Sequence, residues 1–167
     1  CPHFTTISKL KPNIWWDLNE CKDETHWYTD GACKNNQNAL LATAGWGFTG
    51  GSPLEYFGSG NVPSVEVLYK SELITARPTS QRAEGLALLN CIRCIFYSGI
   101  KSHHIINTDS QFWMNMIGFD DSVGWMTKWV ARGQSWDEHK NSDICKLVFA
   151  WWGRVNKFTH VKLRKVK

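Results

Sequence analysis

The apolar residues in the first half of the chain alternate with polar ones, which predicts strands. Strands are expected at residues 27–29, 45–48 and 65–73. The first of them ends at Asp30-Gly31. A Gly-Gly-Ser-Pro stretch at residues 50–53 is typical of a turn after the second.

The period of the apolar residues changes after Thr79 to that of a helix. Across residues 80–97 they recur three and four positions apart, and Gly99 closes the run. Ile105 and Ile106 then predict a short buried strand that leads into Asp109. Further helices are expected at residues 111–117, 124–131 and 141–155, and a last strand at residues 157–162.

This order predicts an α/β fold of the α+β kind, a five-stranded mixed sheet flanked by helices. A chain of 167 residues suits one domain with a core of its own. We expect residues 26–167 to form that domain, after a weakly patterned lead-in segment at residues 1–25.

Composition narrows the class of protein. Hydrophobic residues make up 43% of the chain, so disorder is not the default expectation. No apolar run approaches the roughly 20 residues that span a bilayer, so no membrane partner is expected. Residues 1–4 show neither an initiator Met nor a signal peptide, which suggests a processed product or a fragment.

The six cysteines indicate the compartment, and the basic residues near the C-terminus indicate a possible partner. Cys91 and Cys94 form a CxxC pair without a second pair at zinc spacing, so buried thiols of an intracellular, reducing compartment are expected. Nucleus, mitochondrion and virus stay open as origins. Residues 154–167 contain six Lys or Arg and no acid, which fits either a polyanion-binding segment or a solvated basic tail.

Three acidic residues lie in three separate predicted elements. Asp30 ends a strand, Glu84 lies near the start of the long helix, and Asp109 ends the buried strand. Carboxylates packed together repel each other, and a divalent cation relieves that repulsion. Oxygen ligands alone favour Mg²⁺, or Mn²⁺, over zinc. Each acid also has a local explanation, because Asp30 could cap a turn, Glu84 could support a helix N-terminus and Asp109 could be an N-cap.

Five ordered stretches between residues 27 and 162 resemble the type 1, eukaryotic-like ribonuclease H family. YTDGACKNN, RPTSQRAE and NTDSQFW resemble its three acidic motifs. GWMTKWVARG and KNSDI resemble its substrate-handling region and the helix after it. The resemblance implies a ribonuclease H-like fold and an endonuclease that cleaves the RNA strand of RNA·DNA hybrids with two divalent ions. Asp30, Glu84 and Asp109 would then be both catalytic residues and metal ligands.

The resemblance also assigns substrate contacts. RNA 2′-hydroxyls, which distinguish RNA from DNA, would meet Asn36, Ser80 and Gln81, although the family commonly has Asn where Ser80 stands. A DNA phosphate would bind in a pocket of Arg77, Thr79 and Asn141. The DNA groove and a basic handle would comprise Phe112, Trp125, Lys128, Trp129 and Arg132. Packing in the core is the alternative for the two tryptophans, and it suits Trp129 better.

The chain departs from the family pattern after its last predicted strand. The family continues with a loop His and a helix bearing a fourth metal-binding Asp, whereas here Leu163 to Lys167 follow. Three hypotheses stay open: a piece of an active enzyme, a domain whose missing helix comes from another chain or segment, and a catalytically impaired module. Such a module would bind structured RNA or hybrids, or serve in a ribonucleoprotein assembly. A different nuclease or a transposase of the same superfold is a weaker hypothesis.

Overall fold

The computed structural model describes residues 23–34, 43–51, 56–119 and 122–166. Asn36 and nearly all of the predicted lead-in segment lie outside these residues. The strands are β1 (Glu24–Lys34), β2 (Thr43–Gly50), β3 (Tyr56–Asn61), β4 (Val65–Tyr69), β5 (Glu72–Ala76), β6 (His103–Thr108) and β7 (His160–Lys165). The helices are α2 (Ser80–Ser98), α3 (Gln111–Ile117), α4 (Trp125–Ala131), the short 3₁₀ helix η1 (Trp136–Glu138) and α5 (Ser142–Phe158).

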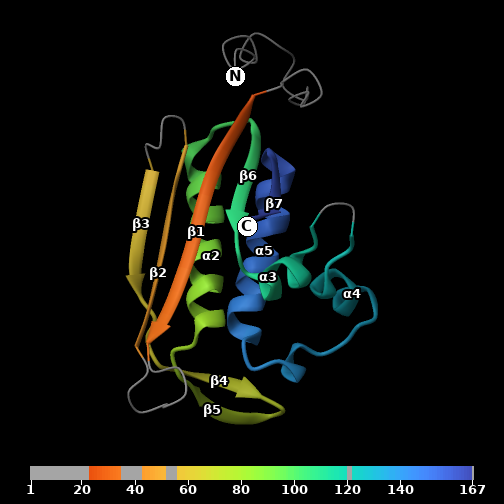
Figure 1. Cartoon of the computed structure of the whole chain (residues 1–167). Helices are drawn as coiled ribbons and strands as arrows, with labels where there is room; N and C mark the ends of the chain where they lie inside the picture. Colours follow the sequence, from red (N-terminus) through yellow and green to blue (C-terminus); the bar gives the residue numbers. More distant parts are fainter. Residues whose placement is uncertain (1–22, 35–42, 52–55, 120–121, 167) are drawn as a thin grey trace.

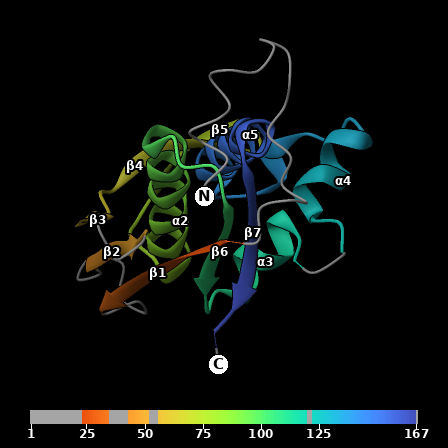
Figure 2. The same cartoon turned by 90° about the horizontal axis from the view of Figure 1, so that it is seen from above.

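A five-stranded mixed sheet organises the molecule, in the order β3-β2-β1-β6-β7 (Figure 1). Strands β1, β2 and β3 pair antiparallel, whereas β6 pairs parallel with both β1 and β7. The view from above shows α2 and α5 together on one face of this sheet, with α3 and α4 beyond the β7 edge (Figure 2). The predicted mixed sheet with flanking helices is therefore confirmed.

Several predicted boundaries are wrong. The segment predicted as one strand at residues 65–73 is a hairpin, in which β4 and β5 form a separate two-stranded sheet. Its turn lies at Lys70 and Ser71, which both have a positive φ. Strand β1 continues to Lys34 instead of ending at Asp30-Gly31, and β7 begins three residues later than predicted because α5 continues to Phe158.

The sequence analysis missed the edge strand β3. Its sequence, Tyr-Phe-Gly-Ser-Gly-Asn, has two glycines and little strand propensity. The structure shows what these glycines do, because the rings of Phe48 and Trp46 lie over Gly58 and Gly60 on the neighbouring strand. A side chain at either glycine would clash with those rings.

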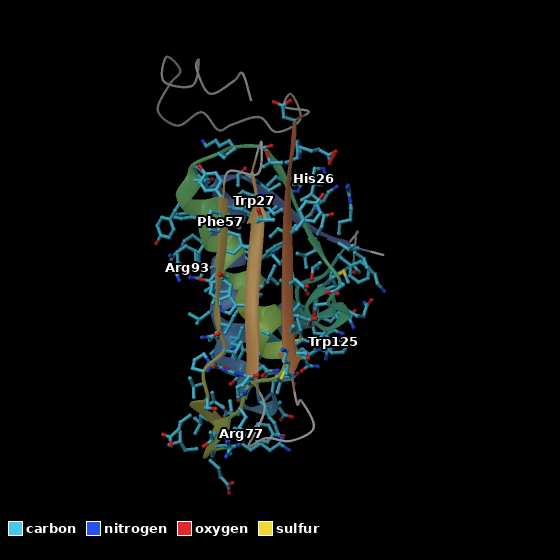
Figure 3. All side chains as sticks on the ribbon, turned by 60° about the vertical axis from the view of Figure 1, so that its left-hand side comes forward. His26, Trp27, Phe57, Arg77, Arg93 and Trp125 are labelled. Carbon is cyan, nitrogen blue, oxygen red and sulfur yellow. The ribbon has the colours of Figure 1, made fainter. Side chains whose placement is uncertain are left out.

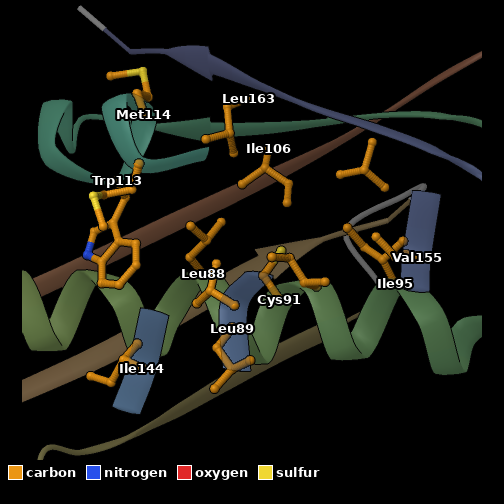
Figure 4. Packing of buried hydrophobic residues seen from close by; sticks show 14 of the residues in the cluster. Leu88, Leu89, Cys91, Ile95, Ile106, Trp113, Met114, Ile144, Val155 and Leu163 are labelled. Carbon is orange, nitrogen blue, oxygen red and sulfur yellow. The ribbon is translucent and has the colours of Figure 1, made fainter. Parts of the chain in front are cut away.

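The core lies between the sheet and the two long helices. Helix α2 contributes the apolar face that its sequence predicts, with Leu88, Cys91, Ile92 and Ile95 all buried (Figure 4). Side chains from the sheet, α3 and α5 complete this core, among them Trp27, Ile106, Trp113, Ile144 and Val155. Burial on this scale is the main source of stability for a domain of this size.

A buried histidine links two strands inside this core. His104 on β6 is fully buried, and its Nδ1 accepts a hydrogen bond of 3.0 Å from the Trp27 indole. Its Nε2 lies 2.8 Å from the carbonyl oxygen of Ile100. Because a carbonyl oxygen only accepts hydrogen bonds, this nitrogen carries the proton. Both contacts suit the neutral ring, and burial lowers the pKa of His104 to about 4.

Two further findings concern expectations from composition. In the described ranges, no helix is long and apolar enough to cross a membrane. Cys33, Cys91, Cys94 and Cys145 are free thiols, and both Cys91 and Cys145 are buried. The expectation of buried thiols for the CxxC pair is therefore confirmed for Cys91, whereas Cys94 is only partly buried.

The fold predicts opposite effects for two helical glycines. A Cβ at Gly85 would overlap the Trp113 indole, whereas Gly153 on α5 has open space around its Cβ position. Overpacking costs about 1–3 kcal/mol, more than the roughly 1 kcal/mol that alanine gains in a helix. Gly85→Ala should therefore destabilise the protein and Gly153→Ala stabilise it, as measured by urea unfolding. A gain in stability for Gly85→Ala would contradict this packing.

His104 should make stability dependent on pH. Its folded pKa lies below its unfolded value of about 6.5, so the unfolded chain binds the extra proton first. The stability contribution is complete above pH 6.5 and falls as the pH drops towards 4, by about 3 kcal/mol in total. Unfolding of wild type and His104→Gln across this range should show a shallower slope for the variant. Identical slopes would contradict the prediction.

Candidate nucleic-acid interface and acidic site

The packing of β1 against the start of α2 brings two of the three acids together. A Cβ on Gly31 would lie 2.5 Å from the backbone carbon of Ala83 and 2.5 Å from the nitrogen of Glu84. Only glycine allows this contact between strand and helix backbones. Asp30 is the preceding residue on β1, and its charge contributes to the raised pKa of Glu84.

The third acid reaches the same region through the parallel pairing of β1 and β6. Asp109 follows the last residue of β6, and Ser110 is the N-cap of α3, where its Oγ accepts a hydrogen bond from the Trp113 N–H. The Ser110 hydroxyl also hydrogen-bonds the Glu84 side chain. Ser110 therefore ties the end of β6 to α2.

The electrostatics of Glu84 reflect the charges of both other acids. Burial is the main cause that raises the pKa of Glu84 above its usual value. The Ser110 hydrogen bond opposes this shift, whereas the negative charges of Asp109 and Asp30 add to it. Glu84 thus experiences both aspartates as like charges.

The local explanations for these acids fit less well than the cluster. Asp30 lies within a strand and not at a turn, and its Oδ1 accepts a hydrogen bond from the Gly31 N–H. Thr79 caps α2 by accepting from the Arg82 N–H, and no acid lies in the first turn of that helix. The prediction that Asp109 could be an N-cap is wrong, because Ser110 has that position.

The acidic cluster fits a hard divalent cation in the type of its ligands and in its mutual repulsion. As the side chains stand, however, no three His, Cys, Asp or Glu residues of the described ranges are placed to hold a metal ion. Binding would therefore require the carboxylates to turn towards one another. Such a turn is open to Asp30, whose Oδ1 accepts a hydrogen bond from the N–H of its own neighbour Gly31 and from no other described residue.

A basic pocket lies at the same end of α2. The three residues predicted to bind a phosphate, Arg77, Thr79 and Asn141, line one cavity of about 280 Å³. Arg82 and Lys140 line it as well, although the sequence analysis assigned neither. Arg77 is exposed at the lower end of the molecule, near the β4–β5 hairpin (Figure 3).

Arg82 is buried at the wall of this pocket and holds two of its neighbours by hydrogen bonds. It is 4% exposed and makes two hydrogen bonds to Asp143, of 3.0 and 2.7 Å, and one of 3.3 Å to the Asn141 side chain. Burial alone would raise the pKa of Asp143, but the hydrogen bonds and charge of Arg82 hold it below its usual value. Arg82 Nε is buried without a partner among the described residues. The pair joins the start of α2 to the start of α5.

Two of the three predicted 2′-hydroxyl contacts lie beside this pocket. Ser80 is the first residue of α2, and Gln81 is exposed next to it. The Gln81 Oε1 accepts a hydrogen bond of 3.3 Å from the Asn141 amide, and its carbonyl oxygen accepts one of 2.8 Å from the Trp113 indole. The first turn of α2 is thereby fixed against α3 and α5.

The predicted groove and handle residues form a separate group on and around α4. One cavity of about 280 Å³ is lined by Trp125, Lys128, Trp129 and Arg132. Trp125 is 46% exposed, whereas Trp129 packs edge-on against Trp136 with ring centroids 5.6 Å apart.

Phe112 lies on the core side of this group. It is partly buried and packs edge-on against Trp113. The arrangement places Trp125 at the surface and both Phe112 and Trp129 mainly in packing contacts.

The open face of the sheet is continuous with the acidic site. A shallow groove of about 670 Å³ lies there between β1, β2 and β3, lined among others by Tyr28, Asp30, Gly47 and Phe57. Tyr28 is 48% and Phe57 81% exposed. This apolar surface next to Asp30 was not anticipated from the sequence.

Comparison with known proteins assigns this arrangement to a family. The family profile described as RNase H matches residues 22–167. The chain belongs to the RNase H family. No curated protein sequence matches the chain.

Solved structures show the same RNase H fold at low sequence identity. RNase H1 from the halophilic archaeon Halobacterium salinarum is 16% identical, with a TM-score of 0.51 over 86% of each chain. LC9-RNase H1, a type 1 RNase H with the type 2 active-site motif, is 15% identical with a TM-score of 0.54, over 86% of this chain and 63% of that one. A foamy viral protease-reverse transcriptase in complex with RNA/DNA hybrid has a TM-score of 0.59 at 14% identity, over 97% of this chain and 20% of that one.

The sequence analysis did not predict that three basic residues lie near these sites. Arg82 lies two positions before Glu84, but nothing in the sequence predicts its pairing with Asp143. Lys140 precedes Asn141 directly. Lys165, at the end of β7, donates a hydrogen bond of 3.1 Å to Gln111 and so lies near the start of α3. Only the parallel pairing of β7 with β6 places it there.

Burial of Glu84, together with the charges of Asp109 and Asp30, predicts that this carboxylate destabilises the RNase H domain. Because the pKa of Glu84 is raised in the folded state, its charged form costs stability above that pKa, and the cost disappears as the pH falls through it. In metal-free buffer, Glu84→Gln should raise the unfolding free energy at pH 7.5, by about 1 kcal/mol or less for a half-exposed group.

Thermal unfolding at pH 7.5 and pH 4 tests this, with the exposed Glu66→Gln as the control. The gain should be absent at pH 4 and absent from the control. A Glu84→Gln protein that is less stable than wild type at pH 7.5 would contradict this prediction.

Proposed function

We propose that this chain is a Mg²⁺-dependent endonuclease that hydrolyses the RNA strand of RNA·DNA hybrids. One observation supports this most strongly: the first turns of α2 adjoin both the acidic cluster and the phosphate pocket. Thr79 caps the helix and lines the pocket, and Glu84 follows five residues later among the acids. A phosphate of the DNA strand held in the pocket would fix the position at which the RNA strand meets the carboxylates.

Different residues would bind the metal ions and position the metal ligands for hydrolysis of a phosphodiester. Asp30, Glu84 and Asp109 would hold two Mg²⁺ ions, or Mn²⁺. Bound there, such ions supply an activated water and stabilise the leaving oxygen. Ser110 positions Glu84 through its hydrogen bond.

The phosphate pocket would hold the DNA strand. Arg77 and Lys140 supply positive charge for a phosphate, and Thr79 and Asn141 supply neutral hydrogen bonds. The exposed Gln81 stands between this pocket and the acids, where an RNA 2′-hydroxyl could be read. Ser80 and Asn36 would also contact RNA 2′-hydroxyls. Trp125, Lys128 and Arg132 would contact the DNA strand in its groove.

Relatives support the choice of substrate. LC11-RNase H1, which is 14% identical with a TM-score of 0.50, was solved in complex with an RNA/DNA hybrid. The foamy viral protease-reverse transcriptase was also solved with such a hybrid. Membership of the RNase H family makes a nuclease the simplest proposal, and the hybrid is the substrate that its acidic and phosphate-binding sites suit.

A catalytically impaired module that binds hybrids or structured RNA, alone or in a ribonucleoprotein assembly, is the second candidate. The observation in its favour is that the described acids do not converge as a metal-ligand group. The groove beside Asp30 also leaves room for a helix from another chain or another segment to complete the site. A protein that binds hybrid equally well in EDTA but never cleaves it would support this candidate over the enzyme.

Substitution of one proposed metal ligand should separate the two candidates. Asp30→Asn should lower the Mg²⁺-dependent cleavage rate of a labelled hybrid by at least about 100-fold, since lost charge stabilisation costs several kcal/mol of barrier. Mg²⁺ should also raise the thermal midpoint of wild type and not that of the variant. Glu66→Gln, an exposed carboxylate on β4, should match wild type in both assays. Equal cleavage by wild type and Asp30→Asn would exclude the proposed enzyme.

A further inference from the structure

The outward sides of α2 and α5 form a second basic surface, well apart from the phosphate pocket. We call it the α2/α5 face and define it by the exposed or half-exposed residues Arg93, Tyr97, Lys101, Trp151, Arg154 and Lys157. Tyr97 follows Glu84 by 13 residues in the same helix, which is about 20 Å at 1.5 Å per residue. In Figure 3, Arg93 lies to the left of the strands and Trp125 to their right.

Cations and aromatic rings alternate on this face. The guanidinium carbons of Arg154 and Arg93 lie 4.5 and 5.5 Å from the centroid of the Trp151 ring. The Tyr97 ring lies 5.7 Å from the same Trp151 ring. Close by, the Lys101 ammonium lies 5.1 Å from the centroid of Phe158. The rings therefore hold the cations at defined positions on the surface.

Among the described residues, no acid is paired with these cations. Neither helix contains Asp or Glu after its first turns, from Gly85 to Ser98 and from Ile144 to Phe158. The salt bridges found between described residues join Arg82 to Asp143 and Arg164 to Glu24, and neither involves a cation of the α2/α5 face. Two guanidinium groups beside one indole repel each other, a cost that a bound polyanion would remove.

An exposed aromatic ring distinguishes this surface from a plain basic patch. Tyr97 is 68% exposed, although its neighbour Phe96 is partly buried among Trp151 and Phe158. Packing accounts for Phe96 and Trp151, but it does not require the Tyr97 ring. Aromatic rings between phosphate-binding cations are the arrangement with which proteins bind single-stranded nucleic acid, by stacking on the bases.

We propose that the α2/α5 face binds single-stranded nucleic acid, with Arg93, Arg154 and Lys101 on the phosphates and Tyr97 stacked on a base. The face is remote from the acidic cluster, so the proposal does not rest on the proposed nuclease activity. If both hold, the face would retain a single strand that extends beyond the hybrid.

Binding of a fluorescent 20-nucleotide single strand tests the proposal, measured by anisotropy with the whole chain in EDTA. Arg154→Glu should weaken binding by about tenfold and reduce the slope of log K against log salt by about 0.7, the value for one phosphate contact. Lys162→Glu is the matched control, because it makes the same charge change on β7. It should change the affinity less than about twofold.

Stacking is tested separately by Tyr97→Ala and Tyr97→Phe. Loss of the ring should weaken binding at least about fivefold, as loss of one base stack does, and Tyr97→Phe should bind like wild type. Thermal midpoints show whether the variants remain folded, and cleavage of a short blunt hybrid should be unchanged in both.

Three results would overturn the proposal. The first is wild-type affinity in Arg154→Glu or in Tyr97→Ala. The second is equal weakening by Lys162→Glu, which would indicate only the overall charge. The third is displacement of the strand by poly-glutamate as effectively as by an oligonucleotide of equal charge, which would point to an acidic protein. Because all binding is measured without metal, a failure of the nuclease proposal leaves these outcomes unaffected.

Discussion

The contact between strand β1 and the start of helix α2 is the constraint on which the site depends. At Gly31 the strand backbone meets the backbone of Ala83 and Glu84 so closely that any side chain would push the two elements apart. That contact sets the position of Asp30 relative to Glu84. The parallel pairing of β6 with β1 then brings Asp109 to the same place, and Ser110 links it to Glu84. The result is that the charges of both aspartates act on Glu84, although the described side chains do not form a metal-ligand group.

The same helix start is held from its other side by an ion pair between the buried Arg82 and the half-exposed Asp143. Arg82 reaches from α2 to Asp143 on α5, and Asn141 shares the contact. Loss of Asp143 would leave the Arg82 side chain, which is 5% exposed, as a buried charge without its partner. This pair therefore fixes the spacing between the two helices at the point where Thr79 and Lys140 line the phosphate pocket. Acidic and basic sites are separated by little more than one helical turn, and both depend on the same packing.

The two faces of the sheet differ in what they leave exposed. Helices α2 and α5 cover one face, and their outward side presents cations stacked on aromatic rings. The other face is open beside Asp30, with the rings of Tyr28 and Phe57 exposed over small residues of β2. A protein that handles a long polyanion can use such surfaces on several sides, because a nucleic acid extends well beyond the residues at which it is cut.

The sequence by itself determined the elements that have a strong period and the residue types of the site. Local sequence predicts the apolar face of α2, its C-cap at Gly99 and the short helix α3. The three acids are recognised through their sequence motifs. The sequence could not define β3 or the β4–β5 hairpin, because glycines and turns with a positive φ obscure the alternation of a strand. Tertiary structure alone decided that Arg82 pairs with Asp143, that Lys165 lies near α3, and that the rings of α5 meet the cations of α2. These contacts join residues far apart in the chain, and their energies depend on distances that only the packing of the sheet against the helices sets.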